Sequence, residues 1–295
     1  SIDAYTPGMT FQLIPSDFQL QEVKVKSNRV SVSSDTLSYL VSGFRMPQDR
    51  SIADVLKKMP GLEVLPGAII RFEDKNISLM MLINPDNPSG HFMPKNDVLQ
   101  LAEWCAIKGI RLLVDESFVD FTYGAVDNSL LYDDILTAYP HMMVMKSISK
   151  SYGVPGLRLG ILATADIDLI VRMKKEVSIW NINSFAEFYM QIFGKYESDY
   201  KKACGKFLQE RNRFFLSLQD ISFLRVIPSQ ANYFLCEITG KYTSAELSRL
   251  LLDRNILIKD CGTKKAFGGK NYIRIAVKNR DENNRLISIL ASFDL

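Results

Sequence analysis

From residue 78 onward, short apolar runs alternate with segments of helical periodicity, and this alternation restricts the fold more than any other feature. Four apolar runs predict buried strands, at Ser78–Ile83, Ile110–Val114, Met142–Met145 and Leu157–Ala163. Between the first two, a helix is expected from Pro94 to about Lys108. Strands separated by helices predict an α/β fold, with a mostly parallel sheet and helices on both faces.

Three polar residues come directly after these strands. Asn87 lies in the loop after the first strand, Asp115 ends the second, and Lys150 follows the third. Sheets of this kind bind ligands beyond the carboxyl ends of their strands. We therefore expect these three side chains to meet at one binding site.

The pattern changes on both sides of this region. After about residue 195 the chain predicts a small α+β domain, in which Thr243 and Glu246 form a capping box and Asp281 caps the last helix. Residues 1–76 hold short β-like stretches and one short helix, Ile52–Met59. We expect three parts: an N-terminal segment (1–76), a large ligand-binding domain (77–195) and a small domain (196–295).

Composition excludes several classes of function. The net charge is +3, and the basic residues are scattered, so no nucleic-acid partner is expected. The apolar runs are too short to span a membrane, and the first residues lack a signal peptide, so we expect a cytoplasmic protein. The 4 cysteines are widely spaced, which argues against a disulfide framework or a zinc site and favours a reduced cytoplasmic setting. Only 2 histidines occur, so chemistry built on histidine pairs or triads is not expected, and proton transfer must fall to lysine, carboxylate or tyrosine.

Lys150 lies in the run Ser-Ile-Ser-Lys-Ser-Tyr-Gly-Val-Pro-Gly-Leu-Arg, which begins at Ser147 and ends at Arg158. A lone lysine after a strand is most often a solvated surface residue. Here hydroxyl groups flank the lysine, and an arginine follows among glycines. This grouping suits an amine that forms a Schiff base with a phosphorylated aldehyde. The hydroxyl groups and the guanidinium would hold the phosphate.

Asp115 and Asn87 each have a simpler alternative. Asp115 ends the run Leu-Leu-Val-Asp and could be only a loop or capping carboxylate; otherwise it keeps a pyridine nitrogen protonated. Asn87 lies in Asn-Pro-Asp-Asn-Pro-Ser-Gly, which could be two plain turns; otherwise its amide bonds a ring hydroxyl of the cofactor.

Arg274 stands among apolar residues in Tyr-Ile-Arg-Ile-Ala-Val. It could point outward from an edge strand. Alternatively, its guanidinium binds the α-carboxylate of a substrate, because arginine can hold a carboxylate through two hydrogen bonds.

Taken together in this order, the motifs of residues 77–295 resemble the aspartate-aminotransferase superfamily, and most of all its histidinol-phosphate aminotransferase branch. The matching pieces are N-P-D-N-P-S-G, V-D-E-S-F, S-I-S-K-S-Y-G-V-P-G-L-R-L-G, P-S-Q-A-N-Y-F and Y-I-R-I-A-V. The resemblance implies a fold-type I enzyme that uses pyridoxal 5′-phosphate.

The same resemblance implies a role for each site residue. Lys150 is the Schiff-base lysine, and Asp115 is the partner of the ring nitrogen. Cofactor binding is completed by Asn87 at the ring hydroxyl and by Ser147 and Arg158 at the phosphate. On the substrate side the resemblance implies Arg274, Asn183 and Asn232.

Two departures from the family pattern stand out. Phe118 occupies a position where the family usually has tyrosine, so one hydrogen bond to the cofactor is lost, worth about 0.5–1.5 kcal/mol. The family also has a further half of the large domain, including a helix whose N-terminus binds the phosphate. No such helix is recognisable in residues 1–76, where Ser42-Gly43 is a faint candidate, so we expect an incomplete large domain, weak cofactor binding and an apolar sheet face that is partly uncovered.

Residues 19–74 resemble instead the plug domain of TonB-dependent outer-membrane receptors, chiefly through Asp-Arg-Ser-Ile-Ala-Asp-Val-Leu-Lys-Lys-Met-Pro-Gly-Leu-Glu-Val. A fused or recombined gene would explain this, and so would a divergent N-terminal region of an ordinary aminotransferase.

The sequence therefore predicts an aminotransferase that acts on a small-molecule amino acid and forms a homodimer. Two alternatives remain open at this point. One is decarboxylation of an amino acid on the same scaffold, because threonine-phosphate decarboxylases carry closely related motifs. The other is an inactive truncated or fused chain.

Overall fold

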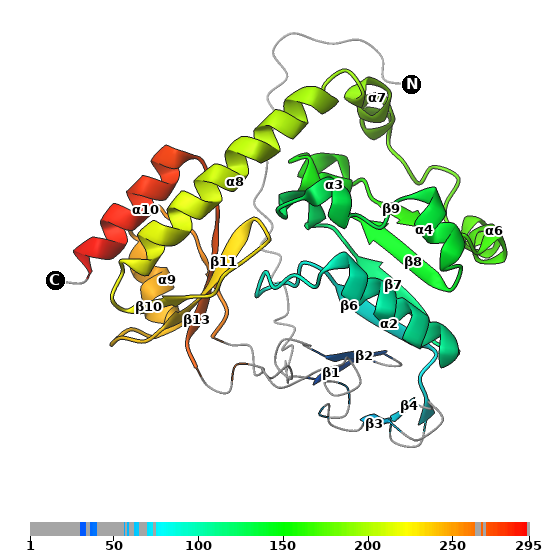
Figure 1. The fold of residues 1–295 in the computed structure, drawn as a ribbon. Coiled ribbons are helices and arrows are strands. Elements are labelled where there is room, and N and C mark those ends of the chain that lie inside the picture. The colour runs from blue at the N-terminus through cyan, green and yellow to red at the C-terminus, as the bar shows by residue number, and fades with distance from the viewer. Residues whose placement is uncertain are drawn as a thin grey trace, which may run out of the picture.

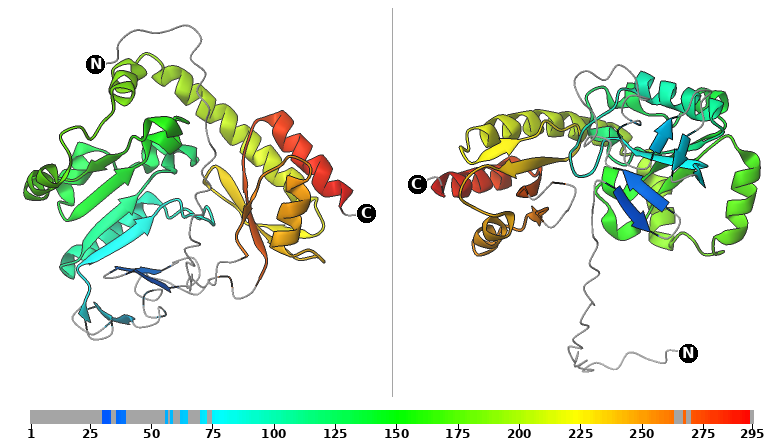
Figure 2. Two further views of the ribbon diagram at one scale, coloured as in Figure 1. Left: turned by 180° about the vertical axis from the view of Figure 1, so that it is seen from behind. Right: turned by 90° about the horizontal axis from the view of Figure 1, so that it is seen from below.

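The computed structural model describes residues 30–33, 36–39, 56, 58, 62–64, 70–72, 75–262, 267 and 270–293. Two units lie side by side in the views of Figures 1 and 2, and the long helix α8 (Glu197–Gln219) runs from one to the other. The large unit holds the predicted α/β sheet, and the small unit holds the C-terminal strands and helices.

The large unit is built on a sheet with strand order β6-β7-β8-β9. Its strands are β6 (Leu79–Ile83), β7 (Arg111–Asp115), β8 (Met142–Lys146) and β9 (Ile161–Ala163). As predicted, β6, β7 and β8 are parallel, and the α/β fold class is confirmed. In contrast, β9 pairs antiparallel with β8. The connection between them holds a single helical turn and a 3₁₀ turn, through which the chain reverses, in place of a crossover helix.

Helix α2 (Lys95–Ile107) packs on one face of this sheet. Its buried residues are Val98, Leu101, Ala102 and Cys105. Their spacing places them along one stripe of the helix. They share an apolar core with alternate strand residues such as Leu82, Leu112 and Val144.

The opposite side of β6 is open to solvent in the described structure. Leu79, Met81 and Ile83 are 50%, 55% and 36% exposed. These residues alternate with the buried ones, because successive side chains of a strand point to opposite faces. The expectation that part of the apolar sheet face is uncovered therefore agrees with the exposure of β6.

The remaining elements of the large unit connect or follow these strands. They are η2 (Val119–Phe121), α3 (Ala125–Asn128), α4 (Asp133–Ala138), α5 (Ile148–Ser151), η3 (Pro155–Leu157), α6 (Ile167–Glu176) and α7 (Ser184–Phe193). Helices α6 and α7 each begin with a side-chain cap, Asp166 and Asn183, which accepts a backbone N–H of the first turn.

The small unit is an antiparallel sheet with strand order β10-β11-β13-β12, packed against helices. Its elements are β10 (Leu224–Val226), β11 (Tyr233–Ile238), α9 (Ser244–Leu252), β12 (Lys259–Asp260), β13 (Tyr272–Ala276) and α10 (Arg280–Ser292). Residues of α8, α9, α10 and the strands form one apolar core. This confirms the predicted strands and helices of the C-terminal region within the described residues.

Three details of the small unit test the expected helix ends. The capping box of Thr243 and Glu246 is present at the start of α9. The expected cap of the last helix is wrong: Asn279, not Asp281, caps α10 by accepting the backbone N–H of Glu282. Helix α8, for which apolar periodicity predicts only the part from Lys206 to Leu218, begins at Glu197, because its first turns carry little apolar periodicity.

Parts of the N-terminal region form small antiparallel sheets. Strands β1 (Val30–Ser33) and β2 (Thr36–Tyr39) pair with each other, and β3 (Leu62–Val64), β4 (Ile70–Phe72) and β5 (Lys75–Asn76) form a second sheet. Most of the expected helix Ile52–Met59 and the dipeptide Ser42-Gly43 lie outside the described residues. Leu56, which is described, is 4% exposed and belongs to the core formed by α2 and the sheet.

The two units meet at the carboxyl end of the parallel sheet. Phe118 and Phe121 of the large unit share an apolar cluster with Ala231 and Tyr233 of the small unit. Arg211 of α8 is buried and donates hydrogen bonds to the carbonyl oxygens of Phe121, at 2.5 Å, and Ala231, at 3.2 Å. The described helices include none that is both long and apolar enough to cross a membrane.

Candidate active site

The loop that carries Asn87 is held on both sides. Asn84 fixes its start, since the side chain donates to the Met93 carbonyl at 2.9 Å and accepts the Met93 N–H at 2.7 Å. The end of the loop touches the small unit, where the Gln230 N–H donates to the Gly90 carbonyl at 2.8 Å. Gly90 has a φ of +71°, and a Cβ atom there would overlap Ser229, so glycine is required. The Asn87 amide is thus placed by the backbone on either side of it.

Asp115 stands at the end of β7, next to the first residues of the following turn. Its Oδ1 atom accepts two hydrogen bonds from Ser117, from the backbone N–H at 2.9 Å and from the hydroxyl at 2.5 Å. Among the described residues, Oδ2 has no hydrogen-bond donor. One carboxylate oxygen is therefore fixed and the other is available to a ligand N–H.

Lys150 lies on the one-turn helix α5 and is exposed. Its Nζ atom is 5.1 Å from the centre of the Phe118 ring, which comes from the turn after Asp115. It makes no ion pair with a described residue. Because α5 is too short to be stable alone, tertiary contacts hold it: the Ser149 hydroxyl accepts the Leu159 N–H at 2.9 Å, and the Ser151 hydroxyl donates to the Ser117 carbonyl at 3.1 Å.

Ser147 and Arg158 flank this helix. The Ser147 N–H donates to the Ser117 hydroxyl at 2.9 Å, so Ser117 joins Asp115 to the start of α5. Arg158 is exposed and has a φ of +56°, which is uncommon for a residue with a side chain. Its guanidinium forms no ion pair within the described part of the chain. Among the described residues, neither the Ser147 hydroxyl nor the Arg158 guanidinium has a hydrogen-bond partner, so both are available to a ligand such as a phosphate.

The structure gives Asn183 and Asn232 local contacts. The Asn183 side chain caps α7 by accepting the Ala186 N–H at 3.0 Å, and it donates to the Leu157 carbonyl at 2.9 Å. Asn232 is half-buried just before β11, and its carbonyl accepts the Val277 N–H at 2.9 Å. Their expected place in a substrate pocket stays a prediction.

Arg274 of β13 reaches across to the large unit. Its Nη1 atom donates to the Asn87 Oδ1 atom at 2.6 Å. The guanidinium also lies over the Tyr233 ring, 4.9 Å from its centre. Arg274 therefore does not point outward from an edge strand, because β13 is a central strand and the side chain meets the Asn87 loop.

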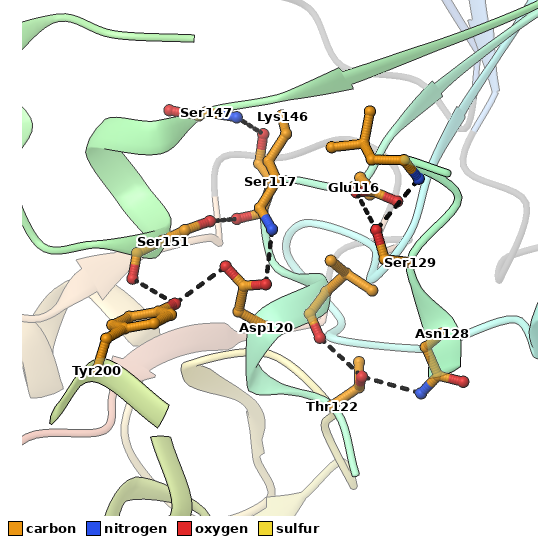
Figure 3. Close-up of polar contacts among 12 residues, drawn as sticks. Glu116, Ser117, Asp120, Thr122, Asn128, Ser129, Lys146, Ser147, Ser151 and Tyr200 are labelled. Atoms are coloured by element: carbon orange, nitrogen blue, oxygen red, sulfur yellow. Dashed lines mark hydrogen bonds and ion pairs between the residues drawn. The ribbon is translucent and has the colours of Figure 1, made fainter. Parts of the chain in front are cut away.

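A buried polar network supports the same edge of the sheet (Figure 3). Lys146, at the end of β8, pairs with Asp120 at 2.6 Å. The Tyr200 hydroxyl of α8 lies 3.0 Å from Asp120 and 3.1 Å from the Ser151 carbonyl. Burial raises the pKa of Tyr200, and the negative charge of Asp120 adds to this effect, so the phenol stays a hydrogen-bond donor. The network joins α8 to the helix that carries Lys150.

Glu116 lies beside this network and is 2% exposed. Its carboxylate accepts the Ser129 hydroxyl at 2.8 Å and the Leu130 N–H at 2.9 Å. Burial raises its pKa, and these hydrogen bonds partly offset the effect. Glu116 therefore anchors the chain after η2 and does not face the candidate site through a described contact.

Sequence reasoning missed Ser117, Tyr233 and the network of Asp120, Lys146 and Tyr200. The pair Asp115 and Ser117 has the spacing of a side-chain-to-backbone turn, which could have indicated Ser117. The other contacts join residues far apart in the chain, and no local pattern indicates them. A separate hollow of 590 Å³ lies at the opposite end of the sheet, against Arg111 and His141, away from the predicted catalytic residues.

Comparison with known proteins identifies the family. The family model Aminotransferase class I and II matches residues 54–290. A CMP-5'-(3-aminopropyl)phosphonate synthase from Streptomyces rubellomurinus is 32% identical over 73% of this chain and 34% of its own. The threonine-phosphate decarboxylase of Salmonella typhimurium is 30% identical over 77% of this chain and 60% of its own. The histidinol-phosphate aminotransferase of Clostridium novyi is 27% identical over 93% of this chain and 67% of its own.

Solved structures give the same result. A decarboxylase from Sulfurospirillum multivorans superposes with a TM-score of 0.66 at 29% identity, over 74% of this chain and 62% of that one. The chain spans about half the length of the curated relatives it matches. It covers 34% of the phosphonate synthase and 60% of the threonine-phosphate decarboxylase.

The predicted receptor plug is not supported. The family match begins at residue 54, inside the segment assigned to the plug, and one aminotransferase aligns with 93% of the chain. Leu56 packs in the core of the large unit, as a residue of the same domain would.

The residues at the carboxyl end of the sheet fit the family's cofactor. An amine (Lys150), a carboxylate with a free oxygen (Asp115) and an amide (Asn87) each lie at or just beyond the carboxyl end of a parallel strand, and these are the groups that an aldehyde, a pyridine nitrogen and a ring hydroxyl require. The cofactor prediction is confirmed at the level of the family, whose members use pyridoxal 5′-phosphate. The chain belongs to the aminotransferase class I and II family.

Proposed function

We propose that this chain acts as a pyridoxal-phosphate-dependent decarboxylase of an O-phosphorylated amino acid. The observation that carries the proposal is the order of similarity. Decarboxylases of threonine phosphate and serine phosphate are 28–30% identical to this chain, whereas histidinol-phosphate aminotransferases are 24–27% identical. The proposal replaces the aminotransferase reading favoured by sequence motifs alone.

The geometry supports a role for each residue in this reaction. The Lys150 amine would hold the cofactor aldehyde, and Asp115, whose Oδ1 atom is fixed by Ser117, would hold a proton on the ring nitrogen with its other oxygen. Arg274 binds a carboxylate of the substrate, at the place where it now meets Asn87. When bound, the cofactor withdraws electrons from the substrate α-carbon.

Decarboxylation breaks the bond between the α-carbon and the carboxylate carbon and releases carbon dioxide. The electron pair left on the α-carbon must take up a proton, and Lys150 is the residue placed to deliver it. In transamination the same lysine would instead remove the α-proton. The two reactions differ in which bond of the α-carbon lies perpendicular to the cofactor ring.

Transamination is the second candidate, and one observation favours it. The histidinol-phosphate aminotransferase from Clostridium novyi aligns with 93% of this chain, more than the 77% aligned with the threonine-phosphate decarboxylase. On this reading the substrate is an amino acid or histidinol phosphate, and the amine is transferred without loss of any carbon.

One experiment separates the two. The purified chain is supplied with pyridoxal phosphate and offered O-phospho-L-threonine or O-phospho-L-serine, and carbon dioxide release is measured. Parallel reactions contain histidinol phosphate and 2-oxoglutarate, and glutamate formation is measured. Carbon dioxide release that is absent in Lys150→Ala supports the proposal. Glutamate formation without carbon dioxide contradicts it.

We also propose a homodimer in the cytoplasm. Trp180, Phe185 and Phe188, on or just before α7, are 90%, 80% and 60% exposed, and exposed aromatic residues of this kind are frequent in interfaces. Light scattering coupled to size-exclusion chromatography tests the dimer.

A further inference from the structure

Tyr233 occupies the centre of the contact between the two units. It begins β11, is 4% exposed, and packs with Phe118, Phe121 and Ala231. Its ring meets the Phe118 ring edge to face at 5.2 Å, and Lys150 lies over that same Phe118 ring. The tyrosine thus lies between Phe118, which contacts Lys150, and Arg274.

Two different parts of the Tyr233 side chain contact two different site elements. The hydroxyl donates a hydrogen bond to the Asp86 backbone carbonyl at 2.8 Å, in the residue just before Asn87. The ring face lies under the Arg274 guanidinium, at 4.9 Å. Arg274 also donates to Asn87 at 2.6 Å, so Tyr233, Arg274 and the loop of Asn87 each contact the other two.

We propose that Tyr233 is a positioning residue, whose hydroxyl sets the loop of Asn87 for the cofactor and whose ring sets Arg274 for the substrate carboxylate. This inference rests on the proposed function, which gives Asn87 and Arg274 their roles. Packing alone does not require the hydroxyl, since a phenylalanine would fill the same space.

The hydroxyl is suited to a permanent hydrogen bond. Burial raises the pKa of the Tyr233 phenol, so the group remains a donor over the range in which the enzyme is assayed. Buried tyrosine hydroxyls are normally paired, and here the partner is a carbonyl of the other unit. The hydrogen bond therefore links the placement of the Asn87 loop to the small unit.

A double-mutant cycle on cofactor affinity tests the hydroxyl. Tyr233→Phe should raise the dissociation constant for pyridoxal phosphate about three- to tenfold, the effect of one hydrogen bond. In a chain that already carries Asn87→Ala, the same replacement should add less than about twofold, because the tyrosine acts through Asn87. Affinity is measured by titration of the chain of residues 1–295 without substrate, from the absorbance of the lysine-bound cofactor.

A second pair of variants tests the ring. Tyr233→Leu should raise the KM for O-phospho-L-threonine at least about fivefold above that of Tyr233→Phe, which keeps the aromatic face. The kcat of the two variants should agree within about twofold. Circular dichroism and thermal unfolding show whether Tyr233→Leu is folded; if it is not, Tyr233→Met, which also lacks the aromatic face, takes its place. A KM equal to that of Tyr233→Phe would overturn the role of the ring.

The outcomes separate this inference from the proposed function. Equal losses of cofactor affinity in both backgrounds, or no loss in Tyr233→Phe, would overturn the positioning role and leave the proposed function intact. A non-additive cycle together with glutamate formation in place of carbon dioxide release would support Tyr233 and overturn the proposed reaction. Absence of cofactor binding by the wild-type chain would overturn both.

Discussion

The two sides of the candidate site differ in how firmly their side chains are held. On the ring side, Asn87, Asp115 and Arg274 each take part in a hydrogen bond of 2.5–2.9 Å to another residue of the site or its support. On the lysine side, formed by Ser147, Lys150 and Arg158, the backbone is anchored but the charged side chains are exposed.

This difference has a physical consequence. The ring side is arranged before any ligand arrives, so little conformational entropy is lost when the cofactor ring binds there. The lysine side must order two long side chains around a phosphate, at a cost of about 0.5–1.5 kcal/mol for each. Substitutions on the two sides should therefore affect chemistry and cofactor affinity in different proportions.

The largest effect is expected from Lys150→Ala. Without the amine no covalent bond to the cofactor forms, and turnover should fall by about four orders of magnitude or more. Borohydride reduction followed by peptide mapping should label Lys150 in the wild-type chain and nothing in the variant. Lys150→Arg is the matched control, because it keeps the charge over Phe118 but cannot form a Schiff base. A label on another lysine would remove Lys150 from this role.

Asp115→Asn should have the next largest effect. The amide cannot keep a proton on the ring nitrogen, so turnover should fall about 100- to 1000-fold, whereas cofactor affinity should fall less than about tenfold. The exposed Asp97 of α2 offers a control, and Asp97→Asn should leave both values unchanged. Near-normal turnover in Asp115→Asn would show that the ring side lacks its assigned carboxylate.

The sequence predicted those parts of the fold that depend on the local pattern of apolar residues. Apolar runs located β6, β7 and β8, and helical periodicity located the buried face of α2. It did not predict the direction of β9, because a short reversing connection and a crossover look alike in an apolar pattern. The capping asparagine of α10 was missed because an equally good capping residue, Asp281, follows it two positions later.

The candidate site shows the same limit. The motifs placed Asn87, Asp115 and Lys150 at strand ends, and the structure puts all three at one edge of the sheet. The bond between Arg274 and Asn87, and the place of Tyr233 beneath Arg274, depend on how the two units meet. No spacing within either segment contains that information. The residue roles themselves stay predictions until they are tested.

Arg274→Lys should raise KM rather than lower kcat. Lysine keeps the charge but loses the planar fork that binds a carboxylate through two hydrogen bonds, so KM for the amino acid should rise about 10- to 50-fold. Steady-state kinetics measure this, with Arg280→Lys at the exposed start of α10 as the control. A fall in kcat at constant KM would mean that Arg274 does not bind the substrate carboxylate.

Arg158→Ala tests the lysine side directly. If the guanidinium binds the cofactor phosphate, its loss should weaken cofactor affinity about tenfold, because an exposed charge contributes less than a buried one. The kcat at saturating cofactor should change less than about threefold. High salt should weaken the wild-type affinity and reduce the difference between the two proteins. Equal affinity of both proteins at low salt would place the phosphate elsewhere.

The smallest functional effect is expected from Ser117→Ala, although this residue joins the two sides. Its hydroxyl donates to Asp115 and accepts the Ser147 N–H, and its side chain is buried. The variant loses both hydrogen bonds, and the Ser147 N–H is left without its partner, which should lower the free energy of unfolding by about 1–3 kcal/mol.

Turnover should nevertheless fall only about threefold. The Ser117 backbone N–H still donates to Asp115 at 2.9 Å, so the carboxylate loses only one of the two hydrogen bonds that orient it. Chemical denaturation and kcat are measured beside Ser248→Ala, whose buried hydroxyl lacks a hydrogen-bond partner among the described residues and should cost nothing. If Ser117→Ala reduces turnover as strongly as Asp115→Asn, the Ser117 backbone N–H is not enough to position Asp115. Its position would then depend on the Ser117 hydroxyl, which also accepts the Ser147 N–H. The contrast between a preformed ring side and a responsive lysine side would then be wrong.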